Sequence, residues 1–461
     1  MVFSSLNFLF IFLPITLLLY FILPERLKNL VLLIASIIFY AWGEPVYVIL
    51  MLLSILFNYF SGLQLSAARN DKKRKKQLVL SIIVNLLLLG FFKYFGFLIS
   101  TFNAIFGSNI ASPELSLPIG ISFYTFQALS YVIDVYRKNV RTQKNIINFA
   151  MYITMFPQLI AGPIVKYSDI ENQITNRRIT LSQAGEGVER LVLGLAKKVL
   201  LANNLGLLYT TIQAADERSF LTAWLGAAAY TMQIYFDFSG YSDMAIGMGK
   251  MLGFDFPENF NYPYLAKSIT DFWRRWHITL SSWFRDYLYI PLGGNRVAPV
   301  RHILNIFIVW MLTGLWHGAG WNFVLWGVYY GIILILEKYV LTPLCKNFPT
   351  WIKHIYTIIL VMLGWVIFSN TDFACMGTYL SNLFGSGTIG LVDADFWYYL
   401  KSNLILIVLS IIACSPAFKN LFIRITQKKA AAALVITIVL LLLCVAFLVF
   451  GSYNPFLYFR F

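Results

Sequence analysis

Residues 270–296 read TDFWRRWHITLSSWFRDYLYIPLGGNR, and they lie between YFDFSGYSD at 235–243 and LTGLWHGAGW at 312–321. The chain of 461 residues is 59% apolar and holds only four histidines, of which His277 and His317 fall in this block. Ionisable side chains are costly inside a membrane and usually mark a working site. This block is therefore the candidate functional region of the chain.

The composition indicates a membrane protein. Mean hydropathy is +0.70, and the chain is 17% aromatic but only 12% charged, which is typical of the membrane class. The net charge of +15 could indicate nucleic-acid binding, but the basic residues lie in short clusters between apolar runs, as they do in cytoplasmic loops. Nucleic acid is therefore not expected as a partner. The four cysteines have no C-x-x-C spacing, so neither a zinc site nor a disulfide framework follows. No metal and no bound cofactor are expected.

Apolar segments recur along the chain and predict about 11 or 12 membrane-spanning helices in one all-α polytopic domain covering residues 1–461. Most are long enough to cross a hydrocarbon core of ~30 Å. Basic residues follow the first, third and fifth segments, which places the N-terminus outside. The segments lie near residues 7–23, 29–42, 46–65, 78–100, 117–136, 190–212, 219–253, 303–317, 321–336, 355–369, 397–414 and 432–450.

Two stretches, 147–163 and 190–212, fit a simple span less well. Residues 147–163 contain Pro157 and end in Ala-Gly-Pro, which favours a re-entrant or tilted element, because broken backbone at membrane depth needs protein or a water-filled cavity around it. The segment 190–212 carries Lys197 and Lys198, and it is either a span with snorkelling lysines or a surface helix.

The run 219–253 has polar residues in its middle, among them Asp237 and Asp243. A buried carboxylate or amide is costly unless it is paired. Together with Asn261, these two side chains are candidates for hydrogen bonds that support a substrate site.

Residues 268–288 are predicted to form one helix that begins at Ser268, with Asp271 three positions later as in a capping box. At 100° per residue the aromatic side chains fall on one arc and most charged side chains on the opposite arc. This division is typical of a helix that lies along the membrane boundary. His277 falls on the seam between the arcs, beside Trp273. A simple interfacial belt also explains the aromatic and arginine residues, so both interpretations stay open.

His317 lies between two apolar runs, with Gly314, Gly318 and Gly320 around it. An imidazole, with an ordinary pKa of about 6.5, can accept and return a proton near neutrality, and desolvation keeps it neutral. The small neighbours are expected to leave room for a substrate. The alternative is a structural histidine bonded to a backbone carbonyl.

Other chemistries lack their sequence patterns. The chain has no H-x-x-x-H, H-E-x-x-H or paired-cysteine motif for a metal, no G-x-S-x-G for a serine hydrolase, and no G-x-x-x-x-G-K-[ST] for ATP. The chemistry that remains is a histidine general base that acts on a hydroxyl or thiol.

The longer motifs resemble the membrane-bound O-acyltransferase family and, within it, the bacterial alginate O-acetylation branch. The resemblance extends over nearly the full chain, and so many long motifs in order are more specific than any short pattern. The motifs are PIGISFYTFQALSYVIDVYR at 118–137, MFPQLIAGPIVKY at 155–167, FDFSGYSDMAIGMGKMLGF at 236–254, NFNYPYLAKSITDFWRRWHITLSSWFRDYLYIPLGGNR at 259–296 and LTGLWHGAGWNFVLWG at 312–327.

The resemblance implies a multi-pass enzyme of the cell membrane, in contact with lipid, whose spanning, re-entrant and in-plane helices surround a central tunnel. It implies two signature histidines, His277 and His317, of which the second is catalytic. It further implies that an acetyl group passes from a cytoplasmic donor, expected to be acetyl-CoA, to an extracytoplasmic SGNH-type acetyltransferase partner that modifies a surface polysaccharide.

These implications suggest roles for the named residues. We expect His317 to act as general base on the attacking hydroxyl, a contribution of ~10²–10⁴-fold, and His277 to orient a substrate or relay a proton. Arginines near His277 would attract the phosphates of the donor. The residues expected to bind substrate are Trp273, Arg274, Arg275, Asn261, Asp237, Asp243 and Trp316.

Three rival interpretations stay open. A D-alanyl transfer protein of teichoic-acid modification would use a carrier-protein thioester as its donor. A transporter would also place polar residues at membrane depth, but it would carry out no acyl transfer. A lipid acyltransferase of the same superfamily would accept long-chain acyl-CoA.

Overall fold

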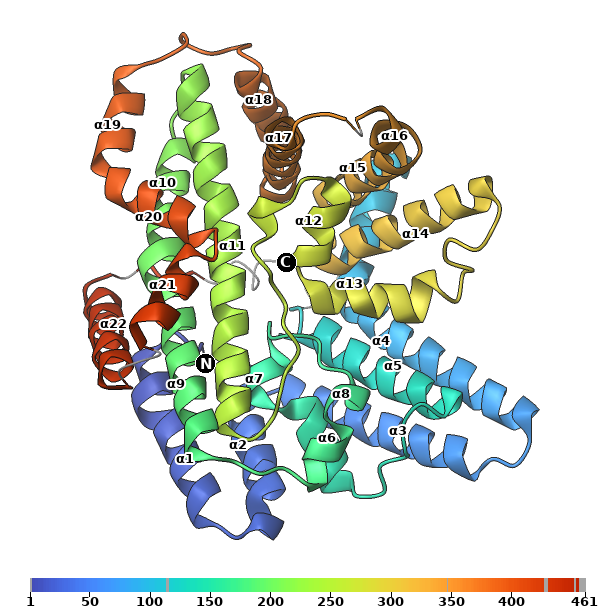
Figure 1. The fold of residues 1–461 in the computed structure, drawn as a ribbon. Helices are drawn as coiled ribbons and strands as arrows, with labels where there is room; N and C mark the ends of the chain where they lie inside the picture. The colour runs from blue at the N-terminus through green and yellow to red at the C-terminus, as the bar shows by residue number, and fades with distance from the viewer. Residues whose placement is uncertain (1, 113–115, 346, 427–429, 452, 456–461) are drawn as a thin grey trace. The chain divides into compact units, whose positions relative to one another are not determined.

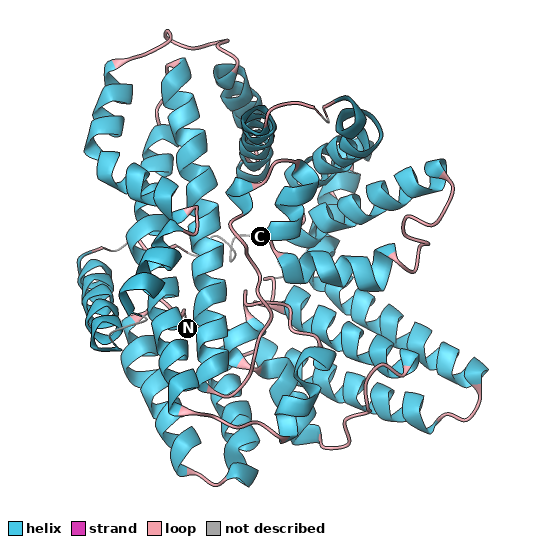
Figure 2. Cartoon of the chain, in the orientation of Figure 1, coloured by secondary structure: helices cyan, strands magenta, loops and turns pink. Residues whose placement is uncertain are grey.

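The computed structural model describes residues 2–112, 116–345, 347–426, 430–451 and 453–455. All regular structure in these residues is helical, without a β-strand (Figure 2), which confirms the all-α class. Packing of the Cα atoms divides the chain into two compact units. Unit 1 comprises Met1–Leu191 with Ser242–Pro257, and unit 2 comprises Val192–Tyr241 with Glu258–Phe461. That both belong to one membrane domain stays a prediction.

Unit 1 has α5 (Ile121–Arg137) at its core. This helix packs against α3 (Tyr47–Ala67) and α4 (Asp71–Phe106), which run alongside it (Figure 1). Asn58 and Asn85 join α3 to α4 through reciprocal amide hydrogen bonds of 3.0 and 2.8 Å. Such polar pairs hold membrane helices together where lipid is as apolar as the side chains. The other helical elements are the π-helical turn Phe8–Phe12, α1 (Leu13–Ile22), the 3-10 turn Glu25–Leu27, α2 (Lys28–Gly43), α6 (Ile146–Thr154), α7 (Phe156–Leu159), α8 (Tyr167–Thr175) and most of α9 (Leu181–Ala196).

The break expected within 147–163 is present. Helix α6 ends at Thr154, Met155 adopts ψ 111°, and the short α7 follows with Pro157 in its first turn. The backbone N–H of Phe156 donates to Ser36 Oγ on α2 at 3.0 Å, so protein surrounds the interruption. A re-entrant path through the membrane remains a prediction.

Unit 2 contains the long α11 (Phe220–Met251), whose last residues extend into unit 1, and a group of helices around α14 (Pro299–His317) and α15 (Trp321–Leu336). The remaining elements are η3 (Lys197–Ala202), α10 (Asn203–Gln213), η4 (Pro263–Leu265), α12 (Ile269–Arg275), α13 (Ile278–Phe284), η5 (Arg285–Tyr289), η6 (Glu337–Leu341), α16 (Thr342–Leu344), α17 (Thr350–Ser369), α18 (Phe373–Leu383), α19 (Ala394–Ser402), α20 (Leu404–Ala413), α21 (Ala417–Thr426) and α22 (Ala430–Phe450).

Helix α11 runs unbroken for 32 residues despite the polar residues in its middle. Within unit 2, Asp237 pairs with Lys198 on η3 at 2.5 Å, and both side chains are buried. Within unit 1, Asp243 pairs with Arg190 on α9 at 2.9 Å. Segment 190–212 is expected from the sequence to be either a span with snorkelling lysines or a surface helix. Snorkelling does not describe Lys198, because a carboxylate on α11 compensates its charge inside the protein.

Among the described residues, seven helices are long and apolar enough to cross a membrane, and the pair α19–α20, bent by 63°, is an eighth candidate. Several expected spans are shorter, since α2 has 16 residues and α5 has 17. The protein is thus a multi-pass membrane protein, while the expected count of 11 or 12 spans stays a prediction. The seven helices are Tyr47–Ala67, Asp71–Phe106, Leu181–Gln213, Pro299–His317, Trp321–Leu344, Thr350–Ser369 and Ala431–Phe450.

Candidate active site

The single helix expected at 268–288 is broken at His277. The predicted start is correct, because Ser268 Oγ accepts a hydrogen bond from the backbone N–H of Asp271 at 2.9 Å. Helix α12 then ends at Arg275, and His277 adopts the left-handed backbone conformation (φ 44°, ψ 53°) before α13 begins. The prediction of one continuous helix is therefore wrong.

The break has a tertiary cause. The segment that precedes α12 lies along the chain at the break, where the N–H of Ile278 donates to the carbonyl of Asn259 and the N–H of Asn261 donates to the carbonyl of Arg275, each at 2.9 Å. Left-handed backbone is uncommon for residues other than glycine and persists where the surroundings over-determine it, often at functional sites. The paired segment holds His277 in this conformation.

The side-chain division of the predicted helix survives the break. Phe272, Trp276 and Leu280 are buried, whereas Arg274 and Arg285 are exposed. Aromatic side chains packed against the rest of the unit decide this division, and they face inward from α12 and α13 alike.

His277 is buried, with 1% of its surface exposed. Its Nδ1 lies 3.1 Å from Asn259 Oδ1, and the ring of Phe238 meets it edge-on at 4.7 Å. His277 lies outside the seven candidate spans. Burial lowers the pKa of His277 well below its ordinary value, and the nearby His317 lowers this pKa further. The imidazole is therefore neutral at physiological pH.

His317 is the last residue of α14 and is 7% exposed. Its ring is surrounded by Trp316 at 5.0 Å, Trp326 at 5.1 Å and Phe368 at 5.4 Å. After it the backbone is extended at Gly318 (φ −168°). The imidazole thus lies at the carbonyl end of α14 within an aromatic shell.

The glycines around His317 serve helix packing. A Cβ on Gly314 would lie 2.3 Å from the backbone oxygen of Phe323, and one on Gly318 would lie 2.2 Å from the Phe323 ring. These glycines let α15 approach α14 closely. The expectation that they leave room for a substrate is wrong at these two positions, because Phe323 fills the space.

The structure brings the two histidines into one cluster. Trp316 packs against both rings, with its centroid 5.8 Å from that of His277 and 5.0 Å from that of His317. Trp273 joins the same core from α12, at 4.7 Å from Trp310 and 5.4 Å from Trp326. Two buried imidazoles thus contact the same aromatic side chain.

Comparison with known proteins decides the family. The model of the membrane-bound O-acyltransferase family matches residues 34–379. The chain belongs to this family. It is therefore a membrane acyltransferase, and enzymes of this family take their acyl group from an acyl donor.

Three relatives illustrate the range of similarity. The Probable alginate O-acetylase AlgI of Pseudomonas aeruginosa is 44% identical over 400 residues, covering 86% of this chain and 77% of the relative. The Peptidoglycan O-acetyltransferase of Helicobacter pylori is 35% identical over 460 residues, covering 91% and 87%. The Teichoic acid D-alanyltransferase of Bacillus subtilis is 27% identical over 276 residues, covering 55% and 69%.

The acyltransferase places the other expected site residues in different surroundings. Asp237 forms the buried ion pair with Lys198, and Asp243 forms its ion pair within unit 1. The side chain of Asn261 is exposed, and its contribution to the break comes from its backbone. Arg275 pairs with Asp271 at 2.9 Å on the same helix. Their roles toward substrate stay predictions.

Asn259 was missed as a site residue by the sequence reasoning. It is fully buried, and its side chain contacts His277 and Thr279. The sequence signal was its place in NFN at 259–261, a few residues before the aromatic helix α12. Nothing in that pattern distinguishes Asn259 from Asn261, whose side chain is exposed.

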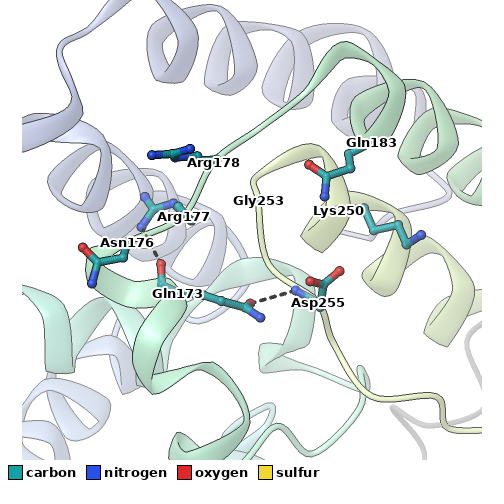
Figure 3. Close-up of a pocket in the computed structure, with 8 residues that line it drawn as sticks. All are labelled: Gln173, Asn176, Arg177, Arg178, Gln183, Lys250, Gly253 and Asp255. Atoms are coloured by element: carbon teal, nitrogen blue, oxygen red, sulfur yellow. Dashed lines mark hydrogen bonds between the residues drawn. The ribbon is translucent and has the colours of Figure 1, made fainter.

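Unit 1 of the acyltransferase has a polar cavity of about 200 Å³ that contains neither histidine (Figure 3). Arg177 lines it but is already engaged, since its Nε donates to Tyr20 OH at 2.7 Å and its guanidinium stacks on Phe254 at 4.7 Å. The neighbouring Arg178 and Asp255 are exposed. The cavity is thus lined by polar and charged side chains and holds neither candidate histidine. Within the described residues, no group of three or more His, Cys, Asp and Glu is placed to hold a metal ion.

Proposed function

We propose that this acyltransferase passes an acetyl group from acetyl-CoA on the cytoplasmic side to an extracytoplasmic, SGNH-type partner that O-acetylates a cell-surface polysaccharide. The observation that carries the proposal is the pair of buried imidazoles that both contact Trp316. The names of the P. aeruginosa and H. pylori relatives, alginate O-acetylase and peptidoglycan O-acetyltransferase, support acetyl transfer to a surface polymer.

The chemistry begins at His317. A neutral ring nitrogen of His317 removes the proton of the acceptor hydroxyl while the hydroxyl oxygen attacks the thioester carbonyl carbon. The carbon–sulfur bond breaks, and the leaving thiolate takes the proton back from the imidazolium. The products are the acetyl ester and the free thiol, so atoms and charge balance. General base catalysis of this kind contributes ~10²–10⁴-fold.

The position of His317 favours this role. Carbonyl groups at the C-terminus of a helix stabilise a positive charge by about 0.3–1 kcal/mol, and His317 ends α14. The imidazolium formed during transfer therefore gains stabilisation that the neutral ring does not. His317 is only 7% exposed within its aromatic shell, and a site with little access to water protects a thioester from hydrolysis.

Arg274 supplies a binding site for the donor. It is exposed on α12, one turn before the break that holds His277. A guanidinium can bind a phosphate through two parallel hydrogen bonds, as the phosphates of coenzyme A require. Arg275 on the same helix adds positive charge near the donor phosphates, although it forms an ion pair with Asp271.

Proteoliposomes that contain the enzyme and its partner, supplied with acetyl-CoA labelled in the acetyl group, test the proposal. Label should reach the partner or polymer with release of one thiol per acetyl group, and His317→Ala should abolish both. His354→Gln is the matched control, because His354 is bonded to the backbone carbonyl of Ala266 at 3.0 Å and has no role in the proposed transfer. Undiminished acetyl transfer by a folded His317→Ala protein would refute the assignment of His317 as the general base.

The same assay separates the rival functions. Label that crosses the membrane without release of thiol would indicate a transporter. Transfer of D-alanine from a carrier-protein thioester, with none from acetyl-CoA, would indicate the D-alanylation branch. Preference for long-chain acyl-CoA would indicate a lipid acyltransferase.

A further inference from the structure

Asn259 holds the side chain of His277 and the backbone of the break together. Its Oδ1 lies 3.1 Å from His277 Nδ1, 3.2 Å from the backbone nitrogen of Thr279 and 2.9 Å from Thr279 Oγ1. Its own carbonyl accepts from the N–H of Ile278 at 2.9 Å. Four interactions of one residue therefore converge on residues 277–279.

These contacts decide where the protons lie. A backbone N–H can only donate, so the Asn259 side-chain atom that faces Thr279 N must be the oxygen and not the amide nitrogen. An oxygen there accepts, so His277 Nδ1 must carry a proton to bond it. A neutral imidazole protonated at Nδ1 leaves its lone pair on Nε2.

His277 Nε2 is the open end of this arrangement. It is buried, and no hydrogen-bond partner for it occurs in the part of the chain that the structure describes. The amide nitrogen of Asn259 is also buried and has no hydrogen-bond partner among the described residues. The groups that pack around the His277 ring are Phe238, Phe260 and Trp316, with His317 as its titratable neighbour.

We propose that Asn259 is a positioning residue that holds His277 in the Nδ1–H tautomer and so presents Nε2 as a second proton-accepting atom of the site. The reacting group it faces is a hydroxyl or thiol, whose proton Nε2 accepts and then returns. This inference rests on the proposed acetyl transfer for its chemical use, but the tautomer itself does not depend on that reaction.

The tautomer can be measured without activity. Because the chain has only four histidines, ¹⁵N-histidine labelling of the full-length protein gives few imidazole signals, and His277→Asn assigns the one from His277. The wild type should show Nδ1 protonated and Nε2 unprotonated. Thr279→Val, which removes one bond to Asn259 but none to His277, should keep this pattern. An Nε2–H signal for His277 in the wild type would overturn the proposal.

Substitution of Asn259 tests its control of the histidine. Asn259→Leu should remove the tautomer preference and lower the transfer rate at least ~10-fold, with little change in the donor KM. Asn259→Asp keeps an oxygen acceptor in place and covers the case in which the leucine variant does not fold. Its carboxylate stabilises the imidazolium, so the acidic limb of the pH–rate profile should move to higher pH by about one unit or more.

The outcomes separate two failures. A folded Asn259→Asp protein with an unmoved pH limb, or an Asn259→Leu protein that retains the wild-type tautomer, would refute the positioning role. A wild-type protein with the Nδ1–H tautomer but without acetyl transfer would instead refute the proposed function and leave the tautomer assignment standing.

Discussion

Replacement of Gly314 by alanine tests whether the close approach of α14 and α15 places His317. The added Cβ would lie 2.3 Å from the backbone oxygen of Phe323, whereas an ordinary carbon–oxygen contact is roughly 3.3 Å. The obstacle is backbone, which cannot rotate away as a side chain can. The two helices must therefore separate by about 1 Å near one turn before His317.

A shift of this size has a predictable effect on rate and stability. Misplacement of a reacting group by about 1 Å can cost ~10²-fold in rate, so acetyl transfer by Gly314→Ala should fall by about that factor. Overpacking of a well-packed interior costs about 1–3 kcal/mol of unfolding free energy. The protein should consequently remain folded, at a lower unfolding temperature.

The assay combines labelled acetyl transfer in proteoliposomes with thermal unfolding in detergent. Gly377→Ala is the matched control, because Gly377 is exposed on α18 and a Cβ there would meet nothing within 4 Å. That variant should transfer acetyl groups at the wild-type rate and should be unchanged or up to about 1 kcal/mol more stable. Wild-type rate and stability in Gly314→Ala would refute the reasoning.

Two further predictions concern buried charge. Lys198→Met leaves the carboxylate of Asp237 buried without its lysine, which should lower the unfolding free energy by about 3–5 kcal/mol. Adding Asp237→Leu to Lys198→Met should recover most of this loss. A double variant that is as unstable in thermal unfolding as the single variant would contradict this prediction. The unfolding free energy should also fall as pH drops below about 6.5, by up to about 1.4 kcal/mol per pH unit. The reason is that His277 takes up a proton in the unfolded chain, whereas its buried imidazole in the folded protein has a lowered pKa and stays neutral. This loss of stability at low pH should be smaller in His277→Asn, because asparagine tolerates the left-handed backbone and has no group that titrates in this range. Equal pH slopes in equilibrium unfolding of the wild type and His277→Asn would contradict the lowered pKa of His277.

The membrane class and the candidate region could be predicted from the sequence because both depend on composition and local pattern. Long apolar runs have one stable solution in lipid, namely helices that satisfy their own backbone hydrogen bonds. Histidine is scarce in this chain, so His277 and His317 in the polar block are predicted as candidates. The motifs around them predict the acyltransferase family, which the comparisons confirmed. The start of α12 at Ser268 followed from capping chemistry.

The remaining features depend on distant parts of the chain. Helical periodicity continues through Trp276 and His277, yet backbone pairing with Asn259 and Asn261 breaks the helix there. Glycines beside His317 suggest open space, and only the position of Phe323 reveals that α15 occupies it.

By itself the sequence determined that this chain is a helical membrane protein of the acyltransferase family, because hydropathy, capping and long motifs can be read from the residue order. Only the tertiary structure decided that both histidines contact Trp316 and that the side chain of Asn259 contacts His277. Those contacts join residues that are far apart in the sequence, and no local pattern encodes which of two similar asparagines faces inward.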